Sequence, residues 1–169
     1  GIFVYPNKTA AITPQAALIC TAADNLFDKA SVKEYFGRIS KGRPDTLSII
    51  AINSILATLG EPILFELDNL YQNIENYTDE QKLFLALGFT NAGDYNRAYE
   101  ILNSGLTDKI LTANGIATFE ADTPSATEYM SCIAAIVTSK LSQSNAKDLV
   151  KGLMNTDDST LTGLAYHTF

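Results

Sequence analysis

The sequence predicts an all-α fold made of consecutive antiparallel helical hairpins, and three observations lead to this prediction. Apolar residues recur at three- and four-residue steps through most of the chain, as on one face of a helix. Helix-start signals recur as Thr-Pro pairs or as a Thr followed by Gln three residues later. Several gaps between predicted helices are so short that neighbouring helices should pack antiparallel. We therefore expect residues 1–169 to form a single helical domain.

Two helices are expected in the first 42 residues. Thr13 is a good N-cap and Pro14 suits the first helical position, so the first helix should begin there and run through Ala22. A shorter helix should follow Ser31 and stop near Gly42. Its expected apolar face consists of Val32, Tyr35, Phe36 and Ile39.

The next two helices differ in how much of their surface is apolar. One should start at Asp45 or Thr46 and end at Gly60 in a left-handed cap. It is the most hydrophobic segment, and we expect it to lie deepest, with Leu47, Ile50, Ala51, Ile55 and Leu59 on its apolar face. The other, from about Ile63 to Asn76, should be an amphipathic surface helix whose buried face carries Leu64, Leu67, Leu70, Tyr71 and Ile74.

A helical hairpin is predicted between Thr78 and Gly105. The segment from Thr78 to Gln81 fits a capping box, and Gly93 should close the helix that follows. Asp94 should cap the second helix, which ends at Gly105. We expect buried stripes of Leu83, Phe84, Leu87 and Phe89 on the first helix and of Tyr95, Ala98, Tyr99 and Leu102 on the second.

The last third of the chain contains a weakly periodic segment and a second hairpin. Residues 106–122 could form a short helix or an extended stretch. Thr123 and Pro124 should start a long helix ending near Leu141, with Tyr129, Cys132 or Ile133, Ile136 and Val137 inward. Ser144 should cap a helix with a stripe of Ala146, Leu149, Val150 and Leu153, and a further helix could begin in Leu161 to Phe169.

The charge balance argues against nucleic acid as a partner, and the length of the apolar segments argues against membrane insertion. With 12 basic and 19 acidic side chains the net charge is −7, and no basic cluster is denser than Lys41-Gly42-Arg43. Nucleic acid is therefore not expected as a partner, because binding phosphates needs concentrated positive charge. The longest mostly apolar segment, Leu47 to Leu59, is too short and contains too many polar residues to be expected to span a membrane.

The motif inventory predicts neither an enzyme nor a cofactor or metal site. His167 is the one histidine, and it lies close to the end of the sequence. The acidic pairs fit helix starts and loops; they are Asp79-Glu80, Glu120/Asp122 and Asp157-Asp158. The aromatic residues that could line a groove fit core packing better; they are Tyr71, Tyr77, Phe84, Phe89, Tyr95 and Tyr99. Cys20 and Cys132 are expected to be buried thiols, with a disulfide between them as the alternative.

Five segments together resemble a known family: Asp45 to Pro62, Leu70-Tyr71, Leu83 to Gly88, Ala92 to Ala98 and Thr123 to Leu153. They look like the helical thioester-domain region of bacterial α2-macroglobulin-like surface proteins. The resemblance implies an α/α toroid or part of one, and a fragment of a larger extracellular or cell-envelope protein. It also implies a scaffold without the reactive thioester, because Cys20 and Cys132 lack the Gly-Glu-Gln that follows the family's cysteine.

A second resemblance covers a shorter stretch. Leu85 to Gly105 is similar to one tetratricopeptide unit, although Lys82 replaces the family's aromatic residue and Ile110 its proline. A second unit at the interval of about 34 residues is not found, which weakens the interpretation as a repeat array.

Two functions from different classes follow as hypotheses. The favoured one is a non-catalytic structural or protein-interaction module that binds a protein partner or neighbouring domains. The alternative is a carbohydrate-binding or hydrolytic fragment on an incomplete α/α barrel, using the acidic loops Glu120/Asp122 and Asp157/Asp158.

Overall fold

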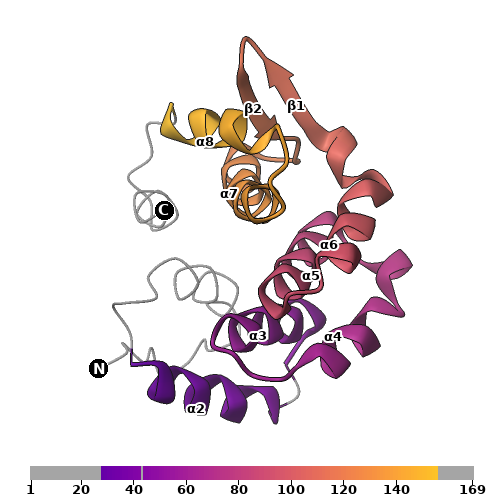
Figure 1. Cartoon of the computed structure of the whole chain (residues 1–169), viewed down its shortest axis with the longest axis vertical. Coiled ribbons are helices and arrows are strands. Elements are labelled where there is room, and N and C mark those ends of the chain that lie inside the picture. The colour runs from indigo at the N-terminus through magenta and orange to yellow at the C-terminus, as the bar shows by residue number, and fades with distance from the viewer. Residues whose placement is uncertain (1–27, 43, 156–169) are drawn as a thin grey trace.

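The computed structural model describes residues 28–42 and 44–155, and these residues are mostly helical (Figure 1). In chain order the elements are α2 (Lys29–Ser40), α3 (Thr46–Thr58), α4 (Leu64–Tyr71), the 3-10 turn η1 (Ile74–Asn76), α5 (Asp79–Ala92), α6 (Tyr95–Ile101), the π-helical turn η2 (Leu102–Leu106), the 3-10 turn η3 (Thr107–Lys109), β1 (Ile110–Ala113), β2 (Ile116–Phe119), α7 (Pro124–Lys140) and α8 (Ala146–Met154). The all-α class is confirmed, with one small two-stranded sheet added to it.

Helix α5 lies at the centre of the packing. The elements follow an arc from α2 through α3 to α6 and then to the β-hairpin, α7 and α8 (Figure 1). Helix α5 packs against α3, α4, α6 and α7. Every residue from Leu83 to Thr90 is buried, so this helix has no solvent-facing side over that length. Closure of the arc into a toroid stays a prediction.

The predicted helix starts are confirmed at four places, one of them Asp94, which caps α6 by accepting a hydrogen bond from the Arg97 N–H. Thr78 and Gln81 form the capping box: the Gln81 N–H donates to Thr78 Oγ1 at 3.3 Å, and the Thr78 N–H donates to Gln81 Oε1 at 3.0 Å. Thr123 caps α7, with Pro124 in its first turn. Asp45 caps α3 by accepting a hydrogen bond from the Ser48 N–H. Such caps satisfy backbone N–H groups that the helix itself leaves unpaired.

Helix α3 lies as deep as its composition predicts. Ile50, Ala51 and Ile52 are fully buried, so the helix is covered on several sides. Its contact with α5 is close, because Ser54 Oγ donates to the Phe84 carbonyl at 2.6 Å. The buried hydroxyl thus pairs with a backbone group of the neighbouring helix as well as with its own.

The segment between Leu106 and Asp122, for which the sequence allowed a helix or an extended stretch, forms the 3-10 turn η3 and an antiparallel β-hairpin. Its turn consists of Asn114 and Gly115, which have positive φ angles of 54° and 73°. A two-residue Asn-Gly loop with positive φ at both positions matches the twist of paired strands. Helix α8 covers β2, and Gly152 approaches the Ala117 carbonyl so closely that a Cβ atom would lie 2.1 Å from its oxygen.

Three predicted boundaries are wrong. Asp28, not Ser31, caps α2, because its carboxylate accepts from the backbone N–H groups of Ala30 and Ser31. Helix α4 ends at Tyr71 because the backbone leaves helical geometry at Asn73 (φ −108°, ψ 16°) before η1 begins. Helix α8 begins after Asn145, so Ser144 does not cap it.

Four residues expected on buried stripes are exposed instead. They are Leu64 (41% exposed), Tyr95 (51%), Tyr99 (37%) and Val150 (44%). The buried face of α6 and η2 is centred on Ala98, Ile101 and Leu102, which places both tyrosines at its margin. In α8, Leu149 and Gly152 are buried, so Val150 points away from the core.

Some predictions concern residues outside the described part of the chain. The helix from Thr13 to Ala22 and the segment from Leu161 to Phe169 both lie there. Within residues 28–42 and 44–155, no helix is both long enough and apolar enough to cross a membrane.

Candidate functional site

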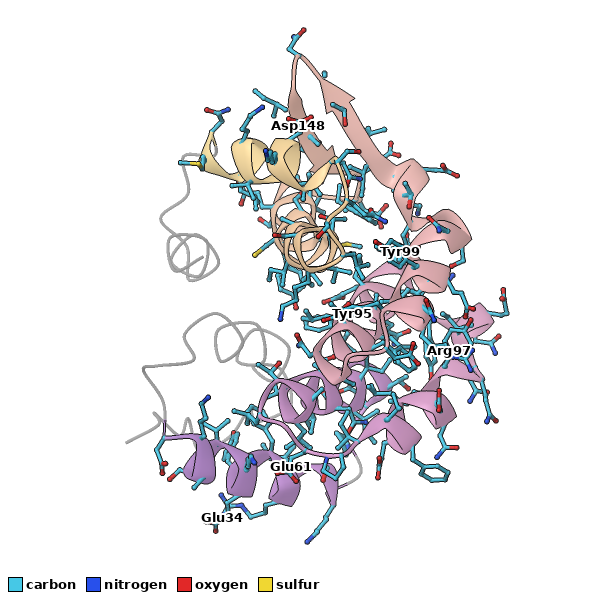
Figure 2. The ribbon with its side chains drawn as sticks, in the orientation of Figure 1. Glu34, Glu61, Tyr95, Arg97, Tyr99 and Asp148 are labelled. Atoms are coloured by element: carbon cyan, nitrogen blue, oxygen red, sulfur yellow. The ribbon has the colours of Figure 1, made fainter. Side chains whose placement is uncertain are left out.

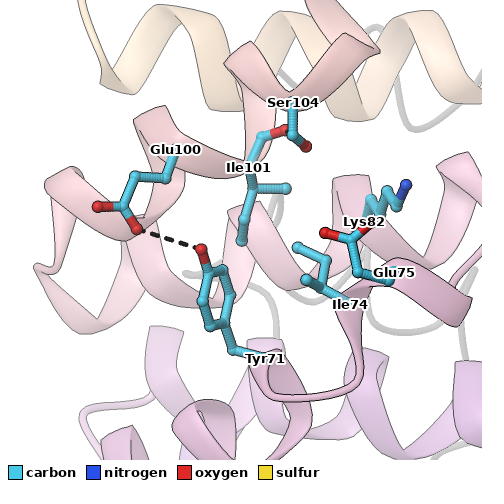
Figure 3. A pocket seen from close by; sticks show the side chains of 7 residues that line it. All are labelled: Tyr71, Ile74, Glu75, Lys82, Glu100, Ile101 and Ser104. Carbon is cyan, nitrogen blue, oxygen red and sulfur yellow. Dashed lines mark hydrogen bonds between the residues drawn. The ribbon is translucent and has the colours of Figure 1, made fainter.

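A small cleft lies between the end of α4, the turn η1, the first half of α5 and the segment where α6 continues into η2 (Figure 3). Its volume is about 70 Å³, and its lining combines an aromatic ring, two isoleucines and charged side chains. The lining residues are Tyr71, Ile74, Glu75, Lys82, Glu100, Ile101 and Ser104. Tyr71 and Glu100 lie on one side of the cleft, and Glu75 and Lys82 on the other.

Tyr71 is held in place from three directions. Its ring meets the ring of buried Phe89 edge-on, with 5.9 Å between the centroids. Its hydroxyl donates to Glu100 Oε2 at 3.2 Å. The Arg97 guanidinium carbon lies 4.4 Å from the centroid of the Tyr71 ring, within the range of a cation–π contact. The ring therefore forms a fixed wall of the cleft.

Arg97 shows how cations are bound beside this cleft. Its Nη1 lies 3.5 Å from Glu100 Oε2 and its Nε lies 3.8 Å from Asp68 Oδ1. The hydrogen bond with Tyr71, followed by the charges of Glu100 and Asp68, raises the pKa of Arg97 above its usual value. One aromatic ring and two carboxylates thus surround a single guanidinium.

A second charged group lies at the start of α5, next to the cleft. Lys109 Nζ forms an ion pair and hydrogen bond with Asp79 Oδ2. The hydrogen bond with Asp79 and the negative charges of Asp79, Glu120 and Asp122 raise the pKa of Lys109. Asp79 and Lys82 lie three residues apart on α5, so this group and the cleft are neighbours.

Glu80 is a half-buried acidic side chain near the start of α5. Burial raises the pKa of its carboxyl, and a hydrogen bond with Tyr129 of α7 partly opposes the shift. The acidic residues that the sequence singled out are therefore placed as follows: Asp79 pairs with Lys109, Glu120 and Asp122 contribute charge that raises the pKa of Lys109, and Glu80 faces α7. Asp157, Asp158, His167 and Cys20 lie outside the described residues.

The aromatic residues and Cys132 are distributed between core and surface. Phe84 and Phe89 are fully buried, as expected, whereas Tyr71 and Tyr77 are only partly buried. Cys132 is a buried free thiol, and burial raises its pKa to about 12. Among the residues that the structure describes, no three His, Cys, Asp or Glu side chains are grouped so that they could hold a metal ion.

The cleft does not follow from the sequence pattern. Tyr71 and Glu100 are 29 residues apart in the sequence, and only the packing of α4 and α6 against α5 brings them together. The sequence signal for it is a tyrosine on a predicted helix together with charged residues between Asp94 and Glu100, and such a combination is too common to identify a site.

No family model, curated protein or solved structure matches this chain.

Proposed function

We propose that this chain is a non-catalytic protein-interaction module that binds a partner protein through the cleft between α4 and α6. The size and lining of the cleft carry the proposal. Sites that enclose a small molecule usually have volumes of about 300–1,000 Å³, whereas this cleft has about 70 Å³. It has room for the end of one side chain, and its fixed tyrosine and charged rim suit an anchor residue of a partner.

We also propose that the module is part of a larger extracellular or cell-envelope protein. The resemblance to the toroid of α2-macroglobulin-like proteins supports this, as do the short connections within α5–α6 and α7–α8. Sequencing the full gene product tests the proposal. A secretion signal, a surface anchor or flanking β-sandwich domains would agree with it, and a cytoplasmic enzyme domain fused to this chain would contradict it.

The carbohydrate alternative has less support from the geometry. Hydrolysis of a glycosidic bond needs two carboxyl groups facing each other across the sugar. The charges of Glu120 and Asp122 favour the ammonium of Lys109, which already pairs with Asp79. We therefore keep protein binding as the proposed function.

A pull-down with matched variants tests the cleft. The wild-type chain, Ser104→Leu and Asn103→Leu are immobilised and exposed to extract and culture medium of the producing cells. Ser104 lines the cleft, whereas Asn103 is its exposed neighbour outside the lining. We expect a protein that the wild-type chain and Asn103→Leu retain and Ser104→Leu loses. Equal retention by all three, or small-molecule binding without any protein, would contradict the proposal.

A further inference from the structure

The acidic charge of the chain is concentrated in the middle of the sequence, which includes the elements that line the cleft. Residues 61–128 carry twelve acidic and three basic side chains, whereas residues 129–155 carry one acidic and three basic ones. Five of these acids line the cleft or act on neighbouring Lys109, and we call them the acidic rim: Glu75, Asp79, Glu100, Glu120 and Asp122. A partner that approaches the cleft therefore meets net negative charge.

The rim also binds the cations that this chain itself provides. Arg97 stacks on Tyr71 and pairs with Glu100, and Lys109 pairs with Asp79. Both basic side chains have raised pKa values caused by these neighbours, so the local potential favours positive charge. After these pairings, Glu75 remains on the far side of the cleft from Glu100, beside Lys82 (Figure 3).

The cleft itself fits the end of a long basic side chain. Ile74 provides apolar contact for methylene groups above the buried Ile101, and Tyr71 offers an aromatic ring. Ser104 offers a hydroxyl oxygen as acceptor, because its proton is donated to the Ile101 carbonyl at 2.7 Å. Glu75 and Glu100 supply two carboxylates beside the ammonium of Lys82, and Glu100 also pairs with Arg97. An acidic side chain in the cleft would be repelled by the two carboxylates. An apolar side chain would remove charged groups from water without pairing with them, which costs free energy.

We infer that the partner presents a Lys- or Arg-rich segment to the acidic rim and that one basic side chain of this segment enters the cleft. This inference rests on the proposed function and adds the chemistry of the partner to it. Attraction between opposite charges would mainly speed association and weaken with salt, while the cleft would position the segment.

Fluorescence anisotropy with labelled octa-arginine and octa-glutamine peptides tests the inference. We expect octa-arginine to bind the wild-type chain at low salt, octa-glutamine not to bind, and the octa-arginine affinity to fall at least fivefold when NaCl rises from about 50 to about 300 mM. Absence of octa-arginine binding at the lower salt concentration would overturn the inference.

Two pairs of variants separate the cleft from general attraction between charges. Glu75→Lys should weaken octa-arginine binding about tenfold, a loss of about 1.4 kcal/mol, whereas Glu34→Lys on distant α2 should change it less than twofold (Figure 2). Ser104→Leu should weaken binding about fivefold, and Asn103→Leu less than twofold. Equal effects within each pair would overturn the inference, because diffuse charge would then explain the binding.

The two proposals can fail separately. If Ser104→Leu loses a protein partner in the pull-down while Glu75→Lys and high salt leave its capture unchanged, the cleft binds protein but the partner segment is not basic. If octa-arginine binding requires both Ser104 and Glu75, the inference stands. Circular dichroism of each variant checks that it is folded, and Glu75→Lys alters only an exposed side chain.

Discussion

The contact between α8 and the β-hairpin predicts a large effect for a small substitution, Gly152→Ala. A Cβ atom at this position would lie 2.1 Å from the Ala117 carbonyl oxygen and 3.2 Å from its carbon. Because carbon and oxygen atoms need about 3.3 Å, helix and strand must move apart by roughly 1 Å. Overpacking of this kind costs about 1–3 kcal/mol, and a backbone clash should reach the upper value. Better helix propensity of Ala returns about 1 kcal/mol, so we expect a net loss of about 2 kcal/mol.

Urea unfolding followed by circular dichroism measures this effect. With a slope of about 2 kcal/mol per molar urea, the midpoint should fall by about 1 M. Gly37→Ala is the matched control, because Gly37 lies in α2 and nothing that packs around it comes within 4 Å of the position a Cβ atom would take. It should gain about 0.5–1 kcal/mol from helix propensity alone. A rise of the midpoint for Gly152→Ala similar to that of Gly37→Ala would refute the close approach of α8 to β2.

Three further predictions concern a cap, a buried carboxyl and a buried thiol. Thr78→Ala should lower the free energy of unfolding by about 1 kcal/mol, because it removes the hydroxyl that accepts from the Gln81 N–H; an unchanged urea midpoint would contradict this. Burial raises the pKa of Glu80, so its carboxyl binds a proton more tightly in the folded chain than in the unfolded one. The charged carboxylate therefore lowers the free energy of unfolding at high pH, and this loss disappears as the pH falls and the carboxyl becomes protonated. Glu80→Gln should therefore raise the urea midpoint more at about pH 7 than at about pH 4.5, and equal shifts at both pH values would argue against burial as the cause. With its pKa raised to about 12, the Cys132 thiol should not react with a thiol reagent at mildly alkaline pH in a folded Cys20→Ser variant and should react in urea, whereas rapid labelling without urea would show that it is accessible.

Local signals in the sequence predicted much of the helical framework. The Thr78–Gln81 capping box, the left-handed Gly93 and the Thr123-Pro124 start each depend on neighbouring residues, and all are present. The β-hairpin was missed although Asn114-Gly115 is a strong hairpin signal, because the strands on both sides are only four residues long. Short apolar runs do not distinguish strand from helix by periodicity.

The exposure of individual side chains and the formation of the cleft depend on tertiary packing, which local sequence patterns do not predict. Tyr95 and Tyr99 have the spacing of a buried stripe, but α6 turns its Ala98 and Ile101 side toward α5. The cleft requires Tyr71 at the end of α4 to meet Glu100 on α6. Neither the stacking of Arg97 on Tyr71 nor the pairing of Lys109 with Asp79 follows from residue spacing in the sequence.

Site-specific photo-crosslinking tests the central claim, binding of a partner protein at the cleft, most directly. Benzoylphenylalanine is placed at position 103, the exposed neighbour of the lining residue Ser104, or at position 34 on α2 as a control (Figure 2). After illumination with extract and medium of the producing cells, cross-linked peptides are identified by mass spectrometry. The account predicts one partner protein attached at position 103 and not at position 34, through a segment rich in Lys or Arg. Cross-links to the same proteins at both positions, or none at position 103, would contradict it.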